Sequence, residues 1–367
     1  MRFSIERGEI LSRLESVASA VAQKTVKPVL SGVLFKATTE GKIELLATDL
    51  ETAIKAVTTP VHIDGEGAFV VEAKVILEVI RNLPSGEIIF ELQDNNLIVR
   101  VEKSKFVLPT ISPDQFPEIE PTHGGIEIET SVTVLELMID RVIFCAAKDE
   151  FMRNLNGIYW ELQGGYLRLV AADGFRLALA EEKIESDVED RFLLTLKSMK
   201  DLQSSIKTAL SDDLRIIYDG AKVGFYFDGI EMIARVVDAE FPDYRKVLPK
   251  AFKTRVVANT TVLSDAIRRA SIAARLGSES VKIELKGESI KLIAKSPEHG
   301  ESTEELDVKK EGDDILIAFN PRFLADSIKK IDTEEVELNF VDSNSPLQMN
   351  PVDVEGYLYI IMPIRLI

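Results

Sequence analysis

The chain repeats one pattern three times, at intervals of 123 residues. Each copy has a glycine at the turn of an expected hairpin, at Gly41, Gly164 and Gly287, and a strand of alternating apolar residues follows it. A second alternating strand precedes each glycine, so every copy predicts a β-hairpin. A period of this length exceeds the roughly 50 residues of a solenoid repeat and is close to the size of a whole domain. The repeat therefore predicts three similar domains.

Two expected helices recur with each hairpin, the first at offsets of 125 and 128 residues and the second at offsets of 123. Ahead of each hairpin, apolar residues recur with helical spacing; they are Ile10, Leu14, Val17 and Val21, then Leu135, Ile139, Val142 and Ala146, then Leu263, Ile267, Ala270 and Ala274. After each hairpin, a strand leads into a second helix, which is entered at Lys74, Lys197 and Asn320. Each domain is therefore expected to be α+β, with two helices and mostly antiparallel strands.

The length of 367 residues divides into three parts of a common domain size. Prolines collect in residues 109–121 and 242–249, which is typical of connections between domains. We place the three domains at residues 1–122, 123–250 and 251–367.

Composition excludes several classes of protein. The sequence has no run of about 18 apolar residues, and charge appears within its first six residues, so we expect neither a membrane span nor a signal peptide. The single cysteine, Cys145, lies in an apolar run and is expected to be an inert core thiol. These features predict a soluble, cytoplasmic protein.

Motifs for catalysis are missing from the sequence. The three histidines are isolated, and there is no metal-binding spacing, no triphosphate loop and no complete dinucleotide loop. We therefore expect no metal, no cofactor and no enzymatic activity. One alternative stays open, in which Asp49 and Asp173 form a catalytic carboxylate pair, although Ser296 stands at the third equivalent place and such aspartates commonly make turn hydrogen bonds.

Charge is distributed unevenly along the chain. The formal net charge is −17, which argues against nucleic acid as a partner of the average surface. The six expected helices and their ends nevertheless carry fifteen Lys and Arg against eight Asp and Glu. If the helices share one surface, that surface is positive and attracts anions although the molecule is acidic.

Four segments carry a resemblance that covers the whole chain. They read LNG at 155–157, ADGFRL at 172–177, FPDYRKVLP at 241–249 and IMPIRL at 361–366. In these segments and in its threefold repeat, the chain resembles the bacterial DNA polymerase III β subunit family, the sliding clamps. The resemblance implies a head-to-tail homodimer that closes into a ring of six domains, with sheets outside and helices facing the hole. Such a processivity factor encircles duplex DNA, tethers the replicative polymerase, is opened by a clamp loader and has no catalytic activity of its own.

The resemblance also implies three sets of site residues. The basic residues expected to face DNA are Lys24, Lys74, Arg81, Lys148, Lys197, Lys200, Arg268, Arg269, Arg275 and Arg322. A groove for peptide motifs is expected from Leu155, Ala172, Gly174, Phe175, Arg176, Leu177, Pro242, Arg245, Val247, Asn344, Leu347, Ile360, Met362, Pro363 and Arg365. The dimer interface is expected to contain Lys103, Lys105, Phe106, Leu108, Ile272, Glu298, Glu301 and Glu304.

The implied partners of the groove are the α subunit of DNA polymerase III, the clamp loader, and proteins of repair and ligation. Phe175 departs from the family, which commonly has histidine there, so the groove is expected to be more apolar. A different class of function also explains the repeats, namely an acidic three-domain interaction scaffold that does not bind DNA.

Overall fold

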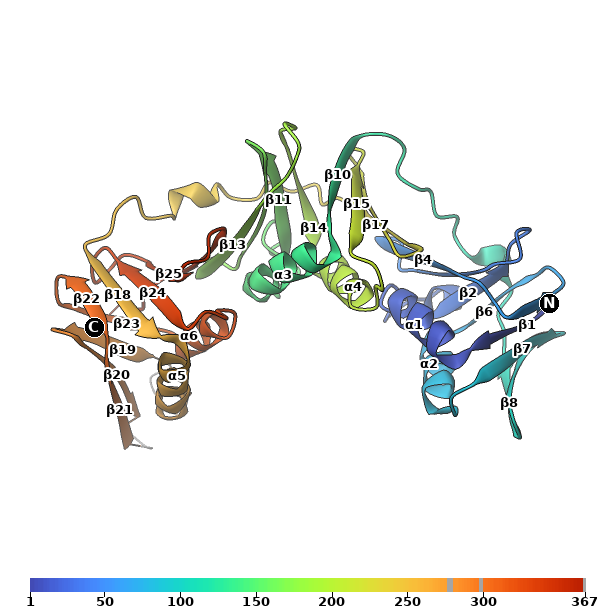
Figure 1. The fold of residues 1–367 in the computed structure, drawn as a ribbon, viewed down its shortest axis with the longest axis horizontal. Coiled ribbons are helices and arrows are strands. Elements are labelled where there is room, and N and C mark those ends of the chain that lie inside the picture. Colours follow the sequence, from blue (N-terminus) through green and yellow to red (C-terminus); the bar gives the residue numbers. More distant parts are fainter. Residues whose placement is uncertain (276–279, 297–299, 366–367) are drawn as a thin grey trace. The chain divides into compact units, whose positions relative to one another are not determined.

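The computed structural model describes residues 1–275, 280–296 and 300–365, and the chain divides into two compact units (Figure 1). The first unit contains Met1–Glu136, Ile184–Val188 and Lys197–Val237, and the second contains Leu137–Lys183, Glu189–Leu196 and Asp238–Ile367. Each unit has two sheets, and every strand pairing between the described strands is antiparallel. The expected α+β class with antiparallel sheets is confirmed.

The first unit has a sheet of five strands and a sheet of eight. In spatial order the smaller sheet has β5 (His62–Asp64), β1 (Arg2–Glu6), β7 (Glu87–Gln93), β8 (Asn96–Val101) and β9 (Ser104–Pro109). The larger has β10 (Ile126–Ser131), β15 (Asp213–Tyr218), β16 (Lys222–Phe227), β17 (Ile230–Arg235), β4 (Thr52–Thr58), β3 (Ile43–Thr48), β2 (Gly32–Ala37) and β6 (Ala68–Glu72).

The second unit has a sheet of nine strands and a sheet of four. In spatial order the larger has β14 (Asp190–Thr195), β11 (Gly157–Gln163), β12 (Tyr166–Ala172), β13 (Arg176–Lys183), β26 (Tyr357–Ile361), β25 (Leu347–Pro351), β24 (Glu335–Phe340), β18 (Thr254–Asn259) and β22 (Lys309–Gly312). The smaller has β21 (Gly300–Asp307), β20 (Ser289–Ser296), β19 (Val281–Lys286) and β23 (Ile315–Phe319).

Six α-helices and four short 3-10 turns lie within the described residues. The helices are α1 (Arg7–Ala18), α2 (Ala73–Asn82), α3 (Val132–Val142), α4 (Leu196–Ile206), α5 (Thr260–Arg275) and α6 (Pro321–Ile328). The 3-10 turns are η1 (Pro28–Ser31), η2 (Pro113–Gln115), η3 (Ile143–Cys145) and η4 (Tyr244–Lys246). Within their own units, α1 packs against α2 and α5 packs against α6 (Figure 1). Among the described residues, none of the helices combines the length and apolar character needed to cross a membrane.

The predicted repeat is visible in the elements. The hairpins β2–β3, β11–β12 and β19–β20 form where the alternating pattern places them. Gly41, Gly164 and Gly287 have φ of +74°, +64° and +57°, a left-handed conformation that favours glycine. The second helices begin at Ala73, Leu196 and Pro321, each within one residue of the predicted entry.

The compact units do not coincide with the three repeats, because sheets continue from one repeat into the next. Strand β17 of the middle repeat pairs with β4 of the first, and β13 of the middle repeat pairs with β26 of the last. Main-chain hydrogen bonds therefore join neighbouring repeats, and the middle repeat contributes strands to both units.

The first helix of the first two copies is shorter than its apolar pattern predicts. Val21 and Ala146 lie beyond the ends of α1 and α3. The reason is a backbone contact that both copies share, in which Ala22 N–H donates to the Leu30 carbonyl at 2.9 Å and Ala147 N–H donates to the Leu155 carbonyl at 3.0 Å. The chain leaves the helix to make this contact.

The core thiol predicted at Cys145 is confirmed. The side chain is fully buried, and burial raises the pKa of the thiol well above its ordinary value. The thiolate that a nucleophile requires is therefore disfavoured.

One ammonium group joins two carboxylates in the first unit. Lys197 on α4 lies 2.7 Å from Asp49 Oδ2 and 2.6 Å from Asp201 Oδ2. Beside this cluster, the hydroxyls of Thr52 and Ser198 are hydrogen-bonded at 2.7 Å. Burial raises the pKa of Asp201 to about 6, because it outweighs the attraction of Lys197, and the nearby charge of Asp49 acts in the same direction. The folded protein therefore binds a proton at Asp201 more readily than the unfolded chain does.

This arrangement predicts a pH-dependent effect of Asp201→Asn. The folded-state pKa of Asp201 is raised, so its contribution to stability is complete below about pH 4 and is lost as the pH rises through about 6. Each unit of pKa corresponds to about 1.4 kcal/mol, so the stability of the wild type relative to the variant should fall by about 1 to 3 kcal/mol between pH 4 and pH 7.5. Thermal unfolding of both proteins across this range measures the difference, and a difference that stays constant or grows with pH contradicts the assignment.

Candidate functional site

The second unit contains an apolar pocket of about 140 Å³. Four parts of the chain form it: Leu155 ahead of β11, the turn between β12 and β13 with the adjoining strand ends, the segment around η4, and the end of β26. The lining residues are Leu155, Ala172, Gly174, Phe175, Arg176, Leu177, Phe241, Pro242, Asp243, Tyr244, Val247, Ile360 and Met362. An open apolar pocket with few polar groups is the kind of surface that binds small ligands and peptide side chains.

Pairing between β13 and β26 positions two sides of the pocket. In this register Leu177 lies opposite Ile360 and Arg176 lies opposite Ile361, and both strands end at this last pair. The N–H of Met362 then donates to the carbonyl of Phe175 at 2.8 Å. Both side chains are exposed beside the pocket, so a flexible thioether and an aromatic ring are available to a ligand.

The turn between β12 and β13 is fixed by Asp173. One oxygen of its carboxylate accepts hydrogen bonds from the N–H groups of Phe175 and Arg176 at 3.0 and 3.1 Å. Asp49 makes the equivalent bonds in the first unit, to the N–H groups of Glu51 and Thr52. The turn role predicted for both aspartates is thereby confirmed, and each carboxylate is also ion-paired, Asp49 with Lys197 and Asp173 with Arg176.

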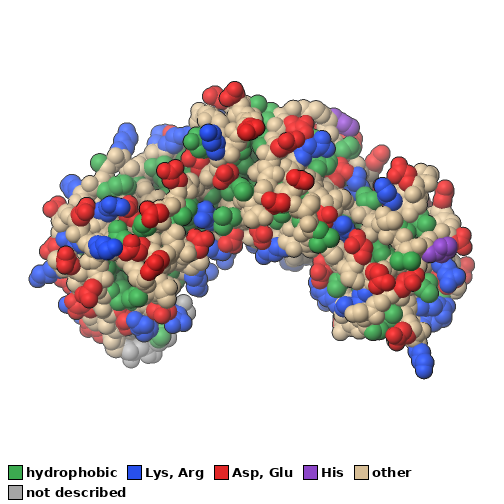
Figure 2. All heavy atoms as spheres, in the orientation of Figure 1, with side chains coloured by type: hydrophobic (Ala, Val, Ile, Leu, Met, Phe, Trp, Pro, Cys, Tyr) green, Lys and Arg blue, Asp and Glu red, His purple; other side chains and the backbone are tan. Residues whose placement is uncertain are grey.

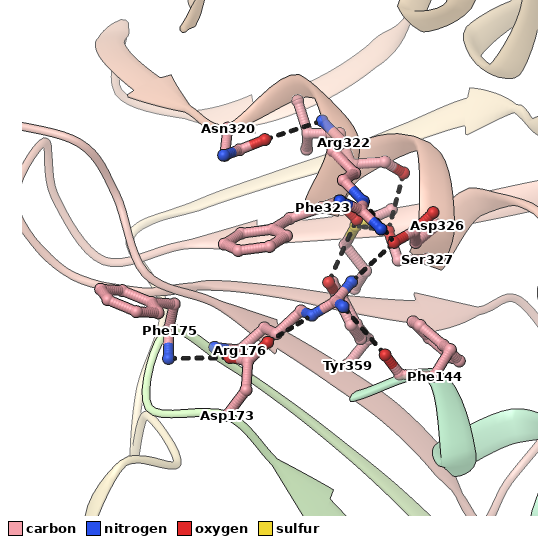
Figure 3. Close-up of polar contacts among 12 residues, drawn as sticks. Phe144, Asp173, Phe175, Arg176, Asn320, Arg322, Phe323, Asp326, Ser327 and Tyr359 are labelled. Atoms are coloured by element: carbon pink, nitrogen blue, oxygen red, sulfur yellow. Dashed lines mark hydrogen bonds and ion pairs between the residues drawn. The ribbon is translucent and has the colours of Figure 1, made fainter. Parts of the chain in front are cut away.

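At the pocket, Arg176 joins three parts of the second unit (Figure 3). Its guanidinium donates to Asp173 at 2.9 Å, to Asp326 of α6 at 2.8 Å and to the carbonyl of Phe144 at 2.9 Å. The same group lies 4.5 Å from the centre of the Phe323 ring, and this ring stacks with Phe175. Burial alone would lower the pKa of Arg176, but the hydrogen bonds to Asp326 and Asp173 reverse this and raise it. Arg176 is thus a fixed cation whose donors are used within the protein.

A buried carboxylate holds the other wall of the pocket. Glu161 on β11 accepts hydrogen bonds from the Tyr244 hydroxyl at 2.7 Å and from Arg245 at 2.6 Å. Burial, together with the charge of Glu161, raises the pKa of Tyr244, so this hydroxyl stays protonated as a donor. Phe241 stacks on Tyr159, with ring centres 4.9 Å apart. These contacts fix the segment around η4 against the nine-stranded sheet.

Ten of the predicted groove residues line this pocket, and five do not. Arg245 instead contacts Glu161 and Gln163, and Leu347 is fully buried in β25. Asn344, Pro363 and Arg365 are also outside the lining. Sequence reasoning missed Phe241, Asp243 and Tyr244, which belong to the same FPDY segment as Pro242 and were recoverable from it.

Three family models match the chain in order. The N-terminal, central and C-terminal domains of the DNA polymerase III beta subunit match residues 1–120, 129–243 and 245–365. A curated relative named beta sliding clamp, from Pseudomonas aeruginosa, is 30% identical over 370 residues and covers 100% of both chains. The chain belongs to the DNA polymerase III beta subunit family.

Solved structures of this family have the same fold. The beta subunit from Thermotoga maritima is 46% identical, with a TM-score of 0.96 and coverage of 100% of both chains. A sliding clamp from Pseudomonas aeruginosa, solved with griselimycin bound, is 28% identical with a TM-score of 0.93 and the same full coverage.

The basic residues that the family resemblance assigns to DNA are mostly exposed. Lys24 and Lys148 lie beyond the ends of α1 and α3 and not within helices, and Lys197 is half-buried in its ion pairs. Arg81, Arg268, Arg269 and Arg322 each lie within 4.0 Å of a carboxylate. Lys74 and Lys200 are exposed on α2 and α4, and the side chain of Arg275 lies outside the described residues.

The positive charge of the helices is smaller than the sequence predicted. Within the described helix bounds there are eleven Lys and Arg against eight Asp and Glu. The difference arises because Lys24, Lys148, Lys207, Lys329 and Lys330 follow the helix ends, whereas Arg7 falls inside α1. Figure 2 likewise shows Lys and Arg interspersed with Asp and Glu over the face in view.

The residues assigned to a dimer interface lie on or near two edge strands. Strand β9 is at one edge of the five-stranded sheet, and β21 is at one edge of the four-stranded sheet. Lys103, Lys105 and Phe106 are exposed at β9, whereas Leu108 is buried opposite Leu97 within its own unit. The exposed apolar neighbour of Phe106 is Val107, which sequence reasoning missed.

Two of the glutamates assigned to the dimer interface already form ion pairs within their own unit. Glu304 accepts two hydrogen bonds from Arg269, at 2.9 and 2.6 Å, and Glu301 lies 3.0 Å from Lys295. Ile272 on α5 is exposed, and Glu298 lies outside the described residues.

The contacts of Arg176 predict a large loss of stability in Arg176→Ala. Its side chain is 6% exposed, and its removal leaves Asp173 and Asp326 without their shared cation. Breaking a buried pair in this way costs about 3 kcal/mol or more. Trp160, the only tryptophan, is buried in the second unit, so urea unfolding followed by tryptophan fluorescence reports the effect.

Lys197→Ala is the matched control for this variant. It removes the cation that bridges Asp49 and Asp201 in the first unit, but that side chain is 40% exposed. We expect a smaller loss of stability, measured by calorimetry, because water replaces part of the interaction. An unchanged Trp160 transition in Arg176→Ala would show that the buried pair contributes no net stability.

Proposed function

We propose that this chain is a DNA sliding clamp, a non-catalytic processivity factor that encircles duplex DNA and tethers the replicative polymerase. The observation that carries the proposal is the full-length match, in order, to all three domains of the beta subunit family. The proposed domains are residues 1–122, 123–250 and 251–367. We further propose that the protein acts in the cytoplasm and needs neither a metal nor a cofactor.

Ring closure is proposed to use the two edge strands. An unpaired edge strand offers its backbone groups to another chain, and a head-to-tail contact either closes into a ring or grows into a filament. Strand β9 exposes Phe106 and Val107 beside Lys103 and Lys105, and β21 carries Glu301 and Glu304. Opposite charges and an exposed apolar pair therefore support a homodimer in which β9 of one copy meets β21 of the other.

Binding to DNA is proposed to be topological and independent of sequence. The net charge of −17 and the small positive excess on the helices disfavour tight binding to phosphates. Exposed lysines such as Lys74 and Lys200 supply weak contacts, and phosphate contacts do not read bases. The closed ring, and not the affinity of its surface, is what retains the DNA in this proposal.

The pocket in the second unit is proposed to bind peptide motifs of partner proteins. We expect these partners to be the DNA polymerase III α subunit, the clamp loader, and proteins of repair and ligation. The apolar lining, the exposed thioether of Met362 and the exposed ring of Phe175 support a groove that accepts several related peptides. The griselimycin-bound relative supports trying the same compound as a probe here.

Retention on DNA tests the proposed function. After loading by a clamp loader with ATP, the protein should stay on a nicked circular plasmid and leave the same plasmid once it is cut to a linear form. Phe106→Ala is the matched control, because a weakened β9 edge should shorten retention on the circle without changing the helices. Gel filtration of the DNA complexes measures both.

Two outcomes contradict this proposal. Equal retention on linear and circular DNA would indicate ordinary surface binding. No retention on either form, with the groove still binding peptide, would favour the acidic interaction scaffold that does not bind DNA.

Met362→Ala should weaken binding to the proposed groove. A suitable probe is a fluorescein-labelled hexapeptide with Leu and Phe as its last two residues, whose side chains match the apolar lining. Loss of the thioether chain should cost about 1 kcal/mol, or roughly a fivefold higher Kd by fluorescence anisotropy. Ile364→Ala is the control, because Ile364 is 38% exposed against 39% for Met362 but does not line the pocket. Equal losses in both variants would contradict the assigned groove.

A further inference from the structure

The first strand of each repeat leads into the first helix, and the outer side of this strand differs among the repeats. The three strands are β1, β10 and β18. A short strand covers the outer side of two of them, because β5 pairs with β1 and β22 pairs with β18. Among the described strands, β10 pairs only with β15 and ends the eight-stranded sheet (Figure 1). One row of its backbone N–H and C=O groups therefore lies outside the ladder.

The covering strands bring an opposite charge to the same position in both repeats. Asp64 of β5 lies opposite Arg2 of β1, and Glu311 of β22 lies opposite Arg255 of β18. Opposite charges at directly facing positions stabilise an antiparallel pair. Both arginines stand five residues before the helix that follows them, and in β10 the residue at this place is Glu127. The charge at the uncovered edge is thus reversed.

The chain has no complementary strand of its own for this edge. Residues 184–188 follow β13 as β5 follows β4 and β22 follows β21, and they fold with the first unit, as β10 does. Glu185 and Asp187 are exposed in this segment, and Glu127 and Glu129 are exposed on β10. Like charges on facing strands destabilise a pair. The segment accordingly forms no strand, and β10 stays at the edge.

The charges on β10 select what the edge can accept. Ile128 points into the core, whereas its neighbours Glu127 and Glu129 are exposed. Arg215 of β15 lies 3.5 Å from Glu127 and offsets one of the two charges, but both side chains of this pair are half exposed. Charged residues on an edge strand prevent identical edges from pairing with each other. The same carboxylates attract a strand that carries Lys or Arg.

We propose that the outer edge of β10 is a docking site for a basic extended segment of a partner protein. The segment adds to the eight-stranded sheet as an antiparallel strand, as β5 and β22 add to their own sheets. Its backbone completes the ladder, and a Lys or Arg lies opposite Glu127. The edge belongs to the first unit, whereas the apolar pocket belongs to the second, so the inference does not rest on the proposed peptide groove.

A labelled basic peptide tests this inference on the full chain. The probe is fluorescein-labelled Lys-Val-Lys-Val-Lys-Val-Lys, and fluorescence anisotropy measures its Kd. Glu127→Arg should raise the Kd about tenfold or more, because a cross-strand attraction becomes a repulsion. Glu87→Arg is the matched control, since Glu87 is also an exposed strand residue of the first unit but lies on the inner strand β7, opposite Glu6. We expect it to leave the Kd unchanged.

A second peptide separates strand addition from attraction between charges. The same sequence with its inner backbone nitrogens methylated keeps all four ammonium groups but cannot donate the hydrogen bonds of a ladder. We expect its binding to be lost. Hydrogen exchange of the β10 amides should also slow when the unmethylated peptide is added, because strand pairing protects backbone N–H groups.

Four outcomes would overturn the inference. Equal affinity for the methylated and unmethylated peptides would show that charge alone attracts the probe. Equal losses in Glu127→Arg and Glu87→Arg would show that no particular edge is involved. No binding of the unmethylated peptide by the folded wild type would remove the site. Full protection of the β10 amides without peptide would show that the edge is already covered within the protein.

Discussion

Antiparallel pairing between strands of neighbouring repeats is the interaction on which the candidate site depends. In the second unit, β13 pairs with β26 so that Arg176 lies opposite Ile361. This register brings the end of the chain beside a turn that is almost 190 residues earlier in the sequence. A shift by one residue would turn every side chain of β26 to the other face of the sheet. The position of Met362 beside Phe175 is therefore fixed by main-chain hydrogen bonds and not by the side chains that would meet a ligand.

Each unit places a single cation between two aspartates, but the cation differs between the units. Each has an aspartate that ends a strand and an aspartate on a helix, and a single cation bridges the two. In the first unit the cation is Lys197, the second residue of α4. In the second unit it is Arg176 on β13, although Arg322, the second residue of α6, also lies 4.0 Å from Asp326.

Arginine in place of lysine changes which groups the cation of this cluster can contact. A planar guanidinium donates in several directions and stacks on an aromatic face, whereas an ammonium is a compact charge. Arg176 accordingly reaches Asp173, Asp326 and the carbonyl of Phe144 while lying over Phe323. The ring of Phe323 in turn stacks with Phe175 at the pocket. The second unit thus connects its buried ion pairs to its apolar site through an aromatic pair, whereas the first unit has a hydroxyl hydrogen bond between Ser198 and Thr52 beside its ion pairs.

The sequence predicted local features well because their causes are local. Turn glycines and alternating strands identified the hairpins, and the short motifs identified most of the pocket. Features that depend on contacts between residues far apart in the sequence were harder to predict. Whether Leu108 or Val107 is exposed depends on which face of the edge strand its own unit covers, and alternation alone does not tell. The place where α1 ends depends on the contact between Ala22 and Leu30, which no helical propensity encodes.

The positive charge of the helices was overestimated from the sequence for the same reason. The corrected charge bears on the proposed mechanism. Basic residues that follow the helix ends were counted with the helices, and several of those within them are paired with carboxylates. Each phosphate that a protein neutralises makes its affinity for DNA depend more strongly on salt concentration and slows its movement along the duplex. A surface with a small positive excess, much of it already paired, makes few such contacts. In the proposed clamp, retention must then come from closure of the ring, so the strength of the β9 and β21 edges matters more for residence on DNA than any single lysine on the helices.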